Sequence, residues 1–534
     1  MRRANLLLAI IIIASLLIRL VISWQEMPVL VEKVLLDDSL YVVSIARNIA
    51  LGNGVTYNGV DMTNGFQPLW GILLVPVFLI TKSISLAINL VLSAASIIDT
   101  LSVVMLFLLA RKLFNEKIGL MSAAFYGLNP FIMFQTLCGI EVVLFIFLAL
   151  TTLYYYHSLK AKVKKTNMII LGILLGLTLL ARLDGIFLAL AIFIQMLWDR
   201  RKNLAQGFKE IAMVALFAGI MMAPWFLWNY ASFGTIVQSS AIAKYNMGHG
   251  IFPFADLKQP QTLSETASMI GENVVRTIGA TVHQLGIVDF DISMITVALS
   301  LFLATTVIVS IKNVRKLRIY FMFSSMLVLF YVFYLWGVQI RYLTPVIPLF
   351  FMLISNGFYN LSMRIKKSDV LLAAFFVLLM VVLFSNGLRQ WDQGYYSWQG
   401  EIYKDALWLR ENTEPSDSIG VFSAGIPIYF SERRVVNLDG VVNFKAIEAL
   451  ENRDVIGYLK SENITLWYDS VYFNKTFTEE YLDGRSVDIL KENIWVDFLG
   501  PEKENLEIID QREGIYKHMR GFDMLVVFFK AKVN

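Results

Sequence analysis

Apolar runs long enough to cross a lipid bilayer recur along the first 390 residues of the chain. Of its 534 residues, 57% are hydrophobic and 16% are charged, whereas about a quarter of the residues in a soluble domain are charged. The sequence therefore predicts a polytopic α-helical membrane protein with about eleven transmembrane helices. These spans are predicted near residues 5–24, 84–110, 118–136, 140–157, 167–181, 185–198, 209–229, 292–311, 319–336, 343–360 and 369–388.

Clusters of basic residues between these spans predict the orientation of the chain. They are MRR at the start, RKLFNEK (111–117), KAKVKK (160–165), DRRK (199–202), KNVRKLR (312–318) and RIKK (364–367). If all of them are cytoplasmic, the positive-inside rule is obeyed at every internal turn, with the N-terminus inside and the C-terminus outside. A single helix over 167–198 would place DRRK outside, so this stretch is predicted to be a hairpin.

Residues 67–81 are apolar but shorter than a full span, and Pro76 interrupts them. Counting them as a span would place every later basic loop on the outside of the membrane. An interfacial or re-entrant helix is therefore predicted here. Residues 25–83 and 230–291 then form two long external loops. Since no small-residue cleavage site follows the first apolar run, it is interpreted as a retained helix in the plasma membrane of a bacterium or archaeon.

Several function classes lack support in the composition. The net charge is only +4 and is spread between loops, which argues against nucleic-acid binding. Cys138 is the single cysteine and there are four histidines without a paired spacing, so neither a disulfide framework nor a resident metal site is predicted. A divalent cation beside a phosphate is left open as a cofactor.

Charged residues gather at the predicted external ends of the spans. A charge near the centre of a membrane-spanning helix is costly, so charges placed at the ends of the spans favour a functional role by default. The residues are Asp37, Asp38, Glu141, Arg182, Asp184, Lys244, His249 and Arg341.

Structural roles compete with functional ones at these positions. An acid at the start of a helix stabilises the helix dipole, which would explain Asp37, Asp38 and Glu141 without any chemistry. Arg182 and Asp184, in the turn of the predicted hairpin, are as well suited to a structural ion pair as to ligand binding.

The remaining charges also have two interpretations. Arg341 could extend to lipid headgroups, although a functional role is favoured. Lys244 and His249 lie in an external loop, where either could be incidental. Arg19 and Asp99 fall within predicted spans and are candidates for a pair that stabilises the helical bundle.

An acid pair and several cations on the external face suit the transfer of a group from a membrane-embedded donor. Nucleotide sugars and ATP are cytoplasmic, so an energised substrate on the outer face must arrive in the membrane, and a polyprenyl-phosphate-linked sugar fits. One carboxylate would deprotonate the acceptor hydroxyl, and cations would stabilise the leaving phosphate. A single displacement would invert the anomeric carbon.

The stretch DDSLYVVSIARNIALGNG (37–54), with TNGFQPLWG (63–71), resembles the first external loop of the GT-C glycosyltransferases. That superfamily includes protein O-mannosyltransferases and the lipid A aminoarabinose transferase. The segments RKLFNEKIGLMSAAFYGLNP followed by GIE, then ARLDG, WNYASFG and RYLTPVIP, are also similar to recurrent GT-C segments. The resemblance covers about residues 5–390 and implies a GT-C membrane domain.

The resemblance also implies site residues. Asp37 is the implied catalytic acid, with Asp38 beside it, and Glu141 is the implied second external acid. Arg182 and Arg341 are implied near the donor phosphate.

Three further residues complete the predicted site, all of them as substrate contacts: Tyr41, Gln67 and His249. Several relatives have lysine or histidine where this chain has Gln67 before a proline. Phosphate recognition would therefore pass to Arg341 or Lys244.

Residues 391–534 have the composition of a soluble domain. Because eleven spans are predicted and the N-terminus is predicted to be cytoplasmic, these residues are predicted to be extracytoplasmic. A helix over 401–412 is followed by alternating elements, with strands at SIGVFS, RVVNLDG, ITLWYD and MLVVFFKA and helices across IPIYFS and NFKAIEALENRDVIGYLKS. This order predicts a small α/β domain. Asp439 and Asn443 in NLDGVVN could bind an acceptor sugar, but Asp-Gly is an ordinary turn, which is favoured.

The sequence thus favours a glycosyltransferase that uses a polyprenyl-phosphate sugar and a glycan, lipid or protein acceptor. A lipid-linked sugar flippase is the first alternative, and a non-catalytic envelope-assembly protein is the second. Transporters tend to show repeated halves and polar groups at the midplane, whereas this sequence shows no repeat and places its polar groups on one face.

Overall fold

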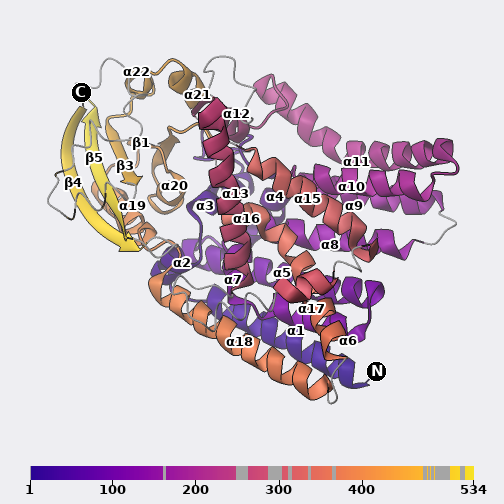
Figure 1. The fold of residues 1–534 in the computed structure, drawn as a ribbon. Helices are drawn as coiled ribbons and strands as arrows, with labels where there is room; N and C mark the ends of the chain where they lie inside the picture. The colour runs from indigo at the N-terminus through magenta and orange to yellow at the C-terminus, as the bar shows by residue number, and fades with distance from the viewer. Residues whose placement is uncertain are drawn as a thin grey trace.

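The computed structural model describes residues 2–159, 164–247, 263–286, 304–310, 315–334, 338–363, 368–472, 506–517 and 523–533, together with residues 478, 482 and 486. A bundle of helices carries a smaller sheet domain formed by the C-terminal part of the chain (Figure 1). Predicted site residue His249 lies outside the described residues, as does most of the predicted span 292–311.

The helices of the bundle follow the apolar runs of the sequence. They are α1 (Arg2–Ser23), α2 (Met27–Lys33), α3 (Asp37–Ala50), α4 (Pro68–Ile80), α5 (Ile84–Leu113), α6 (Glu116–Gly127), α7 (Pro130–Thr136), α8 (Val142–Ser158), α9 (Lys165–Ala181), α10 (Gly185–Asp199), α11 (Leu204–Phe233), α12 (Ser239–Met247), α13 (Leu263–Leu285), α15 (Arg318–Val332), α16 (Ile340–Leu343), the 3₁₀ helix η2 (Thr344–Val346), α17 (Ile347–Ser362) and α18 (Ser368–Gln393). The hairpin predicted within 167–198 is present as α9 and α10.

Among the described residues, four helical segments are long and apolar enough to cross a membrane: 3–23, 84–113, 204–233 and 340–362. Four shorter apolar helices are α4, α8, α9 and α10. The protein therefore has helices that are long and apolar enough to span a membrane, while the count of eleven spans stays a prediction.

One predicted span is in fact two helices. The segment 118–136 was expected to be continuous, but α6 ends at Gly127 and α7 begins at Pro130. The Asn129 side chain accepts hydrogen bonds from the backbone N–H groups of Phe131 and Ile132, so it caps α7. Pro130 follows at the first helical position, where a missing N–H costs nothing.

Arg19 and Asp99 form a completely buried ion pair between α1 and α5. The guanidinium lies 2.6 Å from the Asp99 carboxylate, and both side chains are 0% exposed. Arg19 also donates to the Gly127 carbonyl at 2.7 Å. The Asp99 carboxylate accepts further hydrogen bonds from the Tyr126 hydroxyl at 2.6 Å and the Thr136 hydroxyl at 2.8 Å. This network ties α1, α5, α6 and α7 together.

The C-terminal domain contains α19 (Gln399–Asn412), β1 (Ser418–Val421), α20 (Gly425–Phe430), β2 (Arg434–Asn437), α21 (Phe444–Glu451), α22 (Val455–Ser461), β3 (Leu466–Tyr472), β4 (Leu506–Lys517) and β5 (Asp523–Val533). The sheet order is β2-β1-β3-β5-β4. β1 is parallel to β2 and β3, and β5 is antiparallel to β3 and β4.

Two sequence predictions for this domain were incomplete. The helix expected across NFKAIEALENRDVIGYLKS is divided into α21 and α22, because the Asp454 side chain accepts the Gly457 N–H and starts a new helix. Strand β4 was not predicted, since its sequence, LEIIDQREGIYK, is rich in charged residues. Within the described part of the chain it lies at the edge of the sheet, paired only with β5.

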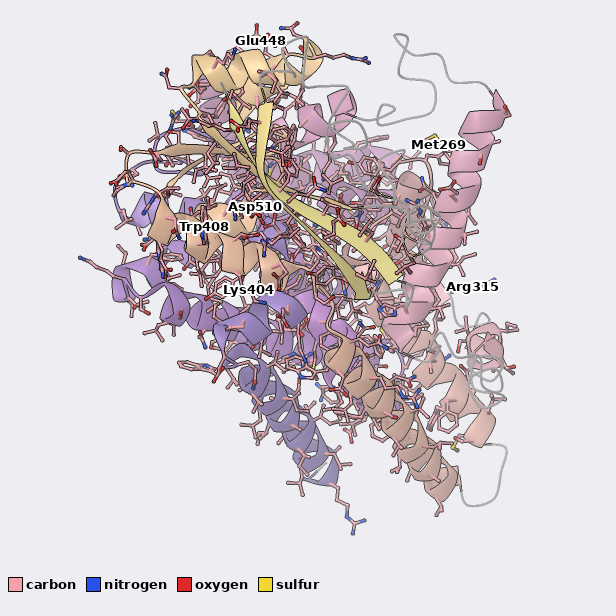
Figure 2. All side chains as sticks on the ribbon, turned by 90° about the vertical axis from the view of Figure 1, so that its left-hand side faces the viewer. Met269, Arg315, Lys404, Trp408, Glu448 and Asp510 are labelled. Atoms are coloured by element: carbon pink, nitrogen blue, oxygen red, sulfur yellow. The ribbon has the colours of Figure 1, made fainter. Side chains whose placement is uncertain are left out.

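The sheet packs between its own helices and the membrane part. Tyr468 and Phe528 belong to one hydrophobic core shared with the helical bundle, whereas Trp467 and Phe529 belong to a second core inside the domain. On α19, the Trp408 ring lies 4.1 Å from the Lys530 ammonium. Lys530 is also paired with Asp510 at 2.8 Å, and Figure 2 shows Trp408 and Asp510 close together. The core that Tyr468 and Phe528 share with the bundle joins the domain to it.

Candidate functional site

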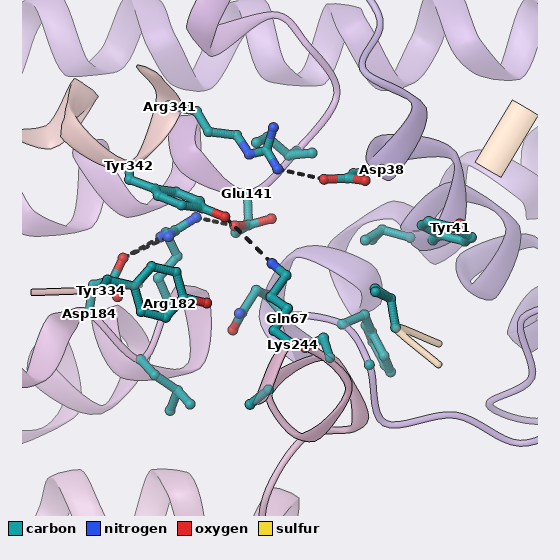
Figure 3. Close-up of a pocket in the computed structure, with 18 of the residues that line it drawn as sticks. Asp38, Tyr41, Gln67, Glu141, Arg182, Asp184, Lys244, Tyr334, Arg341 and Tyr342 are labelled. Carbon is teal, nitrogen blue, oxygen red and sulfur yellow. Dashed lines mark hydrogen bonds and ion pairs between the residues drawn. The ribbon is translucent and has the colours of Figure 1, made fainter. Parts of the chain in front are cut away.

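A cavity of about 290 Å³ brings together most of the site residues that the sequence predicted. It lies between α3, the segment before α4, the start of α8, the α9–α10 turn, α12, the end of α15 and α16 (Figure 3). The predicted residues that line it are Asp38, Tyr41, Gln67, Glu141, Arg182, Lys244 and Arg341. Asp37 instead lines a second cavity, which shares Asp38 and Arg341 with the first.

Asp38 and Arg341 form an ion pair at the edge of the first cavity. The two side chains come within 2.6 Å, and the Asp38 carboxylate is 49% exposed. Arg341 comes from α16, about 300 residues further along the chain, so a long-range contact builds this part of the site. Arg341 therefore does not simply extend to lipid headgroups.

Arg182 has its donors occupied by acids. It is paired with Glu141 at 2.6 Å and with Asp184 at 2.7 Å. It also donates to the Tyr331 hydroxyl at 3.3 Å. Since all three partners hold the guanidinium in place, Arg182 acts on the cavity mainly by positioning two carboxylates.

Lys244 is the cation of the cavity that has no carboxylate partner within the described part of the chain. Its ammonium lies 3.5 Å from the Tyr342 hydroxyl. Beside it in Figure 3 lies Gln67, whose Oε1 atom is buried and has no hydrogen-bond partner among the described residues. An ammonium and an amide oxygen without strong partners are groups that a ligand can engage.

Segments far apart in the sequence hold Lys244 in this place. The first residue of α12, Ser239, donates its backbone N–H to Asn64 Oδ1 at 2.9 Å and its hydroxyl to the Val441 carbonyl at 2.9 Å. Gly65 approaches the same carbonyl so closely that no Cβ atom would fit. The loop between α3 and α4, helix α12 and the C-terminal domain therefore meet at one edge of the cavity.

Asp37 is the first residue of α3 and connects it to the C-terminal domain. Its carboxylate accepts backbone hydrogen bonds from Gly425 at 3.2 Å and Ile426 at 2.6 Å. Gly425 lies against the Asp37 carbonyl, where a Cβ atom would clash. Each carboxylate oxygen keeps a second lone pair for another partner.

Burial raises the pKa of the Asp37 carboxyl to about 7, and the neighbouring charge of Asp38 adds to the shift. The two backbone N–H groups act in the opposite direction but do not cancel it. Asp37 therefore titrates near neutral pH, which suits a general base.

Tyr41 lines the cavity with its ring, while its hydroxyl belongs to the domain contact. The phenol oxygen accepts a hydrogen bond from the Ala424 N–H at 2.8 Å and another from the Asn437 side chain at 3.2 Å. The Tyr41 hydroxyl is therefore held by the C-terminal domain through its lone pairs.

Sequence reasoning missed a group of tyrosines in this cavity: Tyr331, Tyr334 and Tyr342. The Tyr331 and Tyr342 rings are stacked with centroids 4.7 Å apart. Tyr342 lies close to Arg182, Lys244 and Arg341 at once (Figure 3). The aromatic run YVFYLW before RYLTP was the available signal.

Within the described residues, no group of three or more histidine, cysteine, aspartate or glutamate side chains could hold a metal ion. Glu141 and Asp184 are both engaged by Arg182. A divalent cation beside a bound phosphate stays an open prediction.

The site thus combines a helical bundle, an acid pair at the start of α3, a charged cavity lined by Asp38 and a contact with the C-terminal domain. Residues 71–228 match the model of the dolichyl-phosphate-mannose-protein mannosyltransferase family, and residues 390–498 match a domain of unknown function. No curated protein matches the sequence.

Solved structures share the fold. ArnT from Cupriavidus metallidurans bound to undecaprenyl phosphate has a TM-score of 0.56 at 12% identity, covering 97% of both chains. Its apo form has a TM-score of 0.57 at 10% identity with the same coverage. The oligosaccharyltransferase AglB from Archaeoglobus fulgidus, in complex with an inhibitory peptide and a dolichol-phosphate, has a TM-score of 0.50 at 15% identity, covering 86% of this chain and 69% of that one. The family match over residues 71–228 and the fold shared with ArnT and AglB agree with the GT-C resemblance of the sequence.

Proposed function

We propose that this protein transfers a sugar from a polyprenyl-phosphate-linked donor to an acceptor hydroxyl on the outer face of the membrane. The observation that carries the proposal is the cavity in which Lys244 and Arg341 lie with Asp38, the second residue of the acid pair on α3. Structures with the same fold contain undecaprenyl phosphate and dolichol-phosphate, which supports a lipid phosphate as the leaving group here. A flippase is not favoured, since the family match is to transferases.

In the proposed reaction, Asp37 removes the proton from the acceptor hydroxyl as the oxygen attacks the anomeric carbon. The bond between that carbon and the phosphate oxygen breaks, and the electron pair leaves with polyprenyl phosphate. One displacement inverts the anomeric centre. The charge of Asp38 raises the pKa of the neighbouring Asp37 carboxyl and so makes Asp37 a stronger base.

Lys244 and Arg341 would hold the leaving phosphate. Charge-assisted hydrogen bonds from an ammonium and a guanidinium stabilise phosphate oxygens as charge develops on them. Gln67 Oε1, which has no partner among the described residues, would accept a hydroxyl of the donor sugar. Arg182 would keep Glu141 and Asp184 in place around the site.

The proposed orientation places this site and the C-terminal domain outside the plasma membrane, with the N-terminus in the cytoplasm. In Figure 2, the starts of α1 and α18 project at the end of the molecule away from the sheet. Both starts adjoin the basic clusters MRR and RIKK, which the positive-inside rule assigns to the cytoplasm.

The test is release of free polyprenyl phosphate by the purified protein. It would be incubated with a panel of polyprenyl-monophosphate sugars, with and without an extract of envelope glycans, lipids and proteins. We expect release from one donor that depends on the extract, together with a labelled product of inverted anomeric configuration. Absence of release from every donor would contradict the proposal.

The Lys244→Gln variant should bind the donor about 10–100-fold more weakly, because hydrogen bonds to charged groups contribute about 1.5–3 kcal/mol. The measurement is the KM for the donor, together with the Kd for free polyprenyl phosphate. Lys209→Gln, at an exposed position of α11, is the matched control and should change neither constant. If Lys244→Gln and Lys209→Gln have the same KM and Kd, Lys244 does not bind the phosphate.

The pH dependence should report on Asp37. A general base works when deprotonated, so kcat/KM should rise with pH through about 7 and level off above it, following the raised pKa of Asp37. In Asp38→Asn, the neighbouring charge that raises this pKa is lost, so the rising limb should move to lower pH. If the rising part of the kcat/KM profile stays at the same pH in Asp38→Asn, a group other than Asp37 controls it.

A further inference from the structure

A second cavity of about 370 Å³ lies on the other side of the Asp38–Arg341 ion pair. The two cavities share only these two residues among the described residues that line them. Asp37 lines the second cavity and not the first. The acid pair therefore lies where the two cavities meet. Asp37, the proposed base, faces the second cavity, whereas most of the cations line the first.

The chemistry of the two cavities differs. Among its described lining residues the first has three cations and three acids, and the Tyr342 side chain lies close to all three cations. The second contains, among its described lining residues, a single cation, Arg341, which is already paired with Asp38 at 2.6 Å. With Asp37 also in its wall, the second cavity is unfavourable for a phosphate.

The second cavity is instead rich in neutral groups that both donate and accept hydrogen bonds. Gln135, Gln339 and Ser423 supply amides and a hydroxyl, and Tyr396 and Trp398 supply flat aromatic surfaces. The Tyr396 and Trp398 rings meet edge to face with centroids 6.0 Å apart. Amides and hydroxyls match the two-way hydrogen bonding of sugar hydroxyl groups, and aromatic faces cover the apolar face of a sugar ring. Its volume is within the range of small-ligand sites.

The C-terminal domain completes this cavity. Ser423 follows strand β1, and Met524 lies on β5. Gln399, at the start of α19, is buried and accepts the Asp37 backbone N–H at 3.0 Å. Its amide also donates to the carbonyls of Val31 and Leu35, both at 2.8 Å. The same domain therefore forms part of the wall and fixes the backbone of Asp37.

We propose that the second cavity binds the acceptor, and that the acceptor is a neutral saccharide whose hydroxyl group points at Asp37. The inference rests on the proposed function and deepens it, because it names the acceptor class and gives the C-terminal domain a role in acceptor recognition. The acceptor hydroxyl loses its proton to Asp37, its oxygen bonds to the donor's anomeric carbon, and polyprenyl phosphate departs on the side of the first cavity.

Binding of the donor would open the way between the two cavities. A donor phosphate competes with Asp38 for the Arg341 guanidinium, and a shift of Arg341 toward the phosphate releases the ion pair that separates the spaces. The saccharide should therefore bind more tightly when the first cavity already holds polyprenyl phosphate.

The experiment measures saccharide binding by the full chain in detergent or nanodiscs, with and without polyprenyl phosphate. The probes are methyl glycosides and labelled disaccharides of glucose, galactose, mannose and N-acetylglucosamine, beside a Ser/Thr-rich peptide. Ser423→Phe would fill the cavity, and Gln339→Leu would remove a hydrogen-bonding amide from an exposed position. Their matched controls are Ser416→Phe and Gln393→Leu, two exposed positions that line neither cavity.

We expect at least one saccharide to bind, more tightly with polyprenyl phosphate present, and both cavity variants to weaken it by about tenfold or more. The controls should leave it unchanged, and all four variants should bind polyprenyl phosphate as the wild type does. Unchanged saccharide binding in Ser423→Phe, binding of the peptide alone, or binding of no saccharide would each overturn the inference. Failure of the wild type to bind polyprenyl phosphate would be a separate result, which would overturn the proposed function itself.

Discussion

The Asp37→Asn variant is expected to lose about 10²–10⁴-fold in the rate of sugar transfer, the usual contribution of a positioned general base. The donor should still bind, because Asp37 does not line the cavity that contains Lys244 and Arg341. The measurement is kcat for acceptor-dependent release of polyprenyl phosphate, beside the Kd for free polyprenyl phosphate. A large fall in kcat with an unchanged Kd would assign Asp37 to the chemical step.

A purely structural role for Asp37 must be separated from this one. Its carboxylate accepts two backbone hydrogen bonds from α20, and asparagine has only one oxygen to accept them. Tyr41→Phe is the matched control, since it removes a hydroxyl that accepts the neighbouring Ala424 N–H at 2.8 Å and keeps the ring. If Asp37 only held α20 in place, the two variants would lose similar activity and similar thermal stability. We expect Tyr41→Phe to keep most of its activity.

The segment from α3 to α4 could be recognised from sequence because its signals are local. An acid pair directly after an apolar helix, with a glycine and a proline before the next apolar run, is visible in one stretch of about 35 residues. Asp38, Glu141 and Lys244 do meet in one cavity, as the pattern of external charges indicated. The pairing of each charge could not be predicted, since Arg341 meets Asp38 across about 300 residues of chain.

Other parts of the site depend on contacts that no local pattern encodes. Gly425 and Ile426 donate hydrogen bonds to Asp37 because the C-terminal domain, nearly 400 residues further along the chain, packs on α3. The second cavity has the same origin, because Ser423 and Met524 reach it only through the folded sheet. The α/β character of the domain could be predicted from alternating elements, whereas the charged edge strand β4 has no buried face of its own to mark it.

The second large effect concerns stability. The Asp99→Leu variant should lower the free energy of unfolding by about 3–5 kcal/mol, the usual cost of leaving one member of a buried ion pair without its partner. Arg19 would then hold an uncompensated charge at a position that is 0% exposed, between apolar helices. The hydroxyls of Tyr126 and Thr136 would lose a hydrogen-bond acceptor as well. Unfolding of the purified protein by heat or denaturant in detergent measures the change.

The double variant Arg19→Leu/Asp99→Leu shows whether the charge itself is responsible. Replacing both members of a buried pair by apolar residues is often neutral or stabilising, so the double variant should be more stable than Asp99→Leu alone. The double variant should not regain the full free energy of unfolding of the wild type, because the Gly127 carbonyl loses the guanidinium that donates to it at 2.7 Å. The free energy of unfolding lost in the double variant could instead equal the sum of the losses in Arg19→Leu and Asp99→Leu. That result would show that side-chain shape, and not unpaired charge, governs this contact. Neither variant should change kcat of the folded protein, since Arg19 and Asp99 line neither cavity and act only by joining α1 to α5.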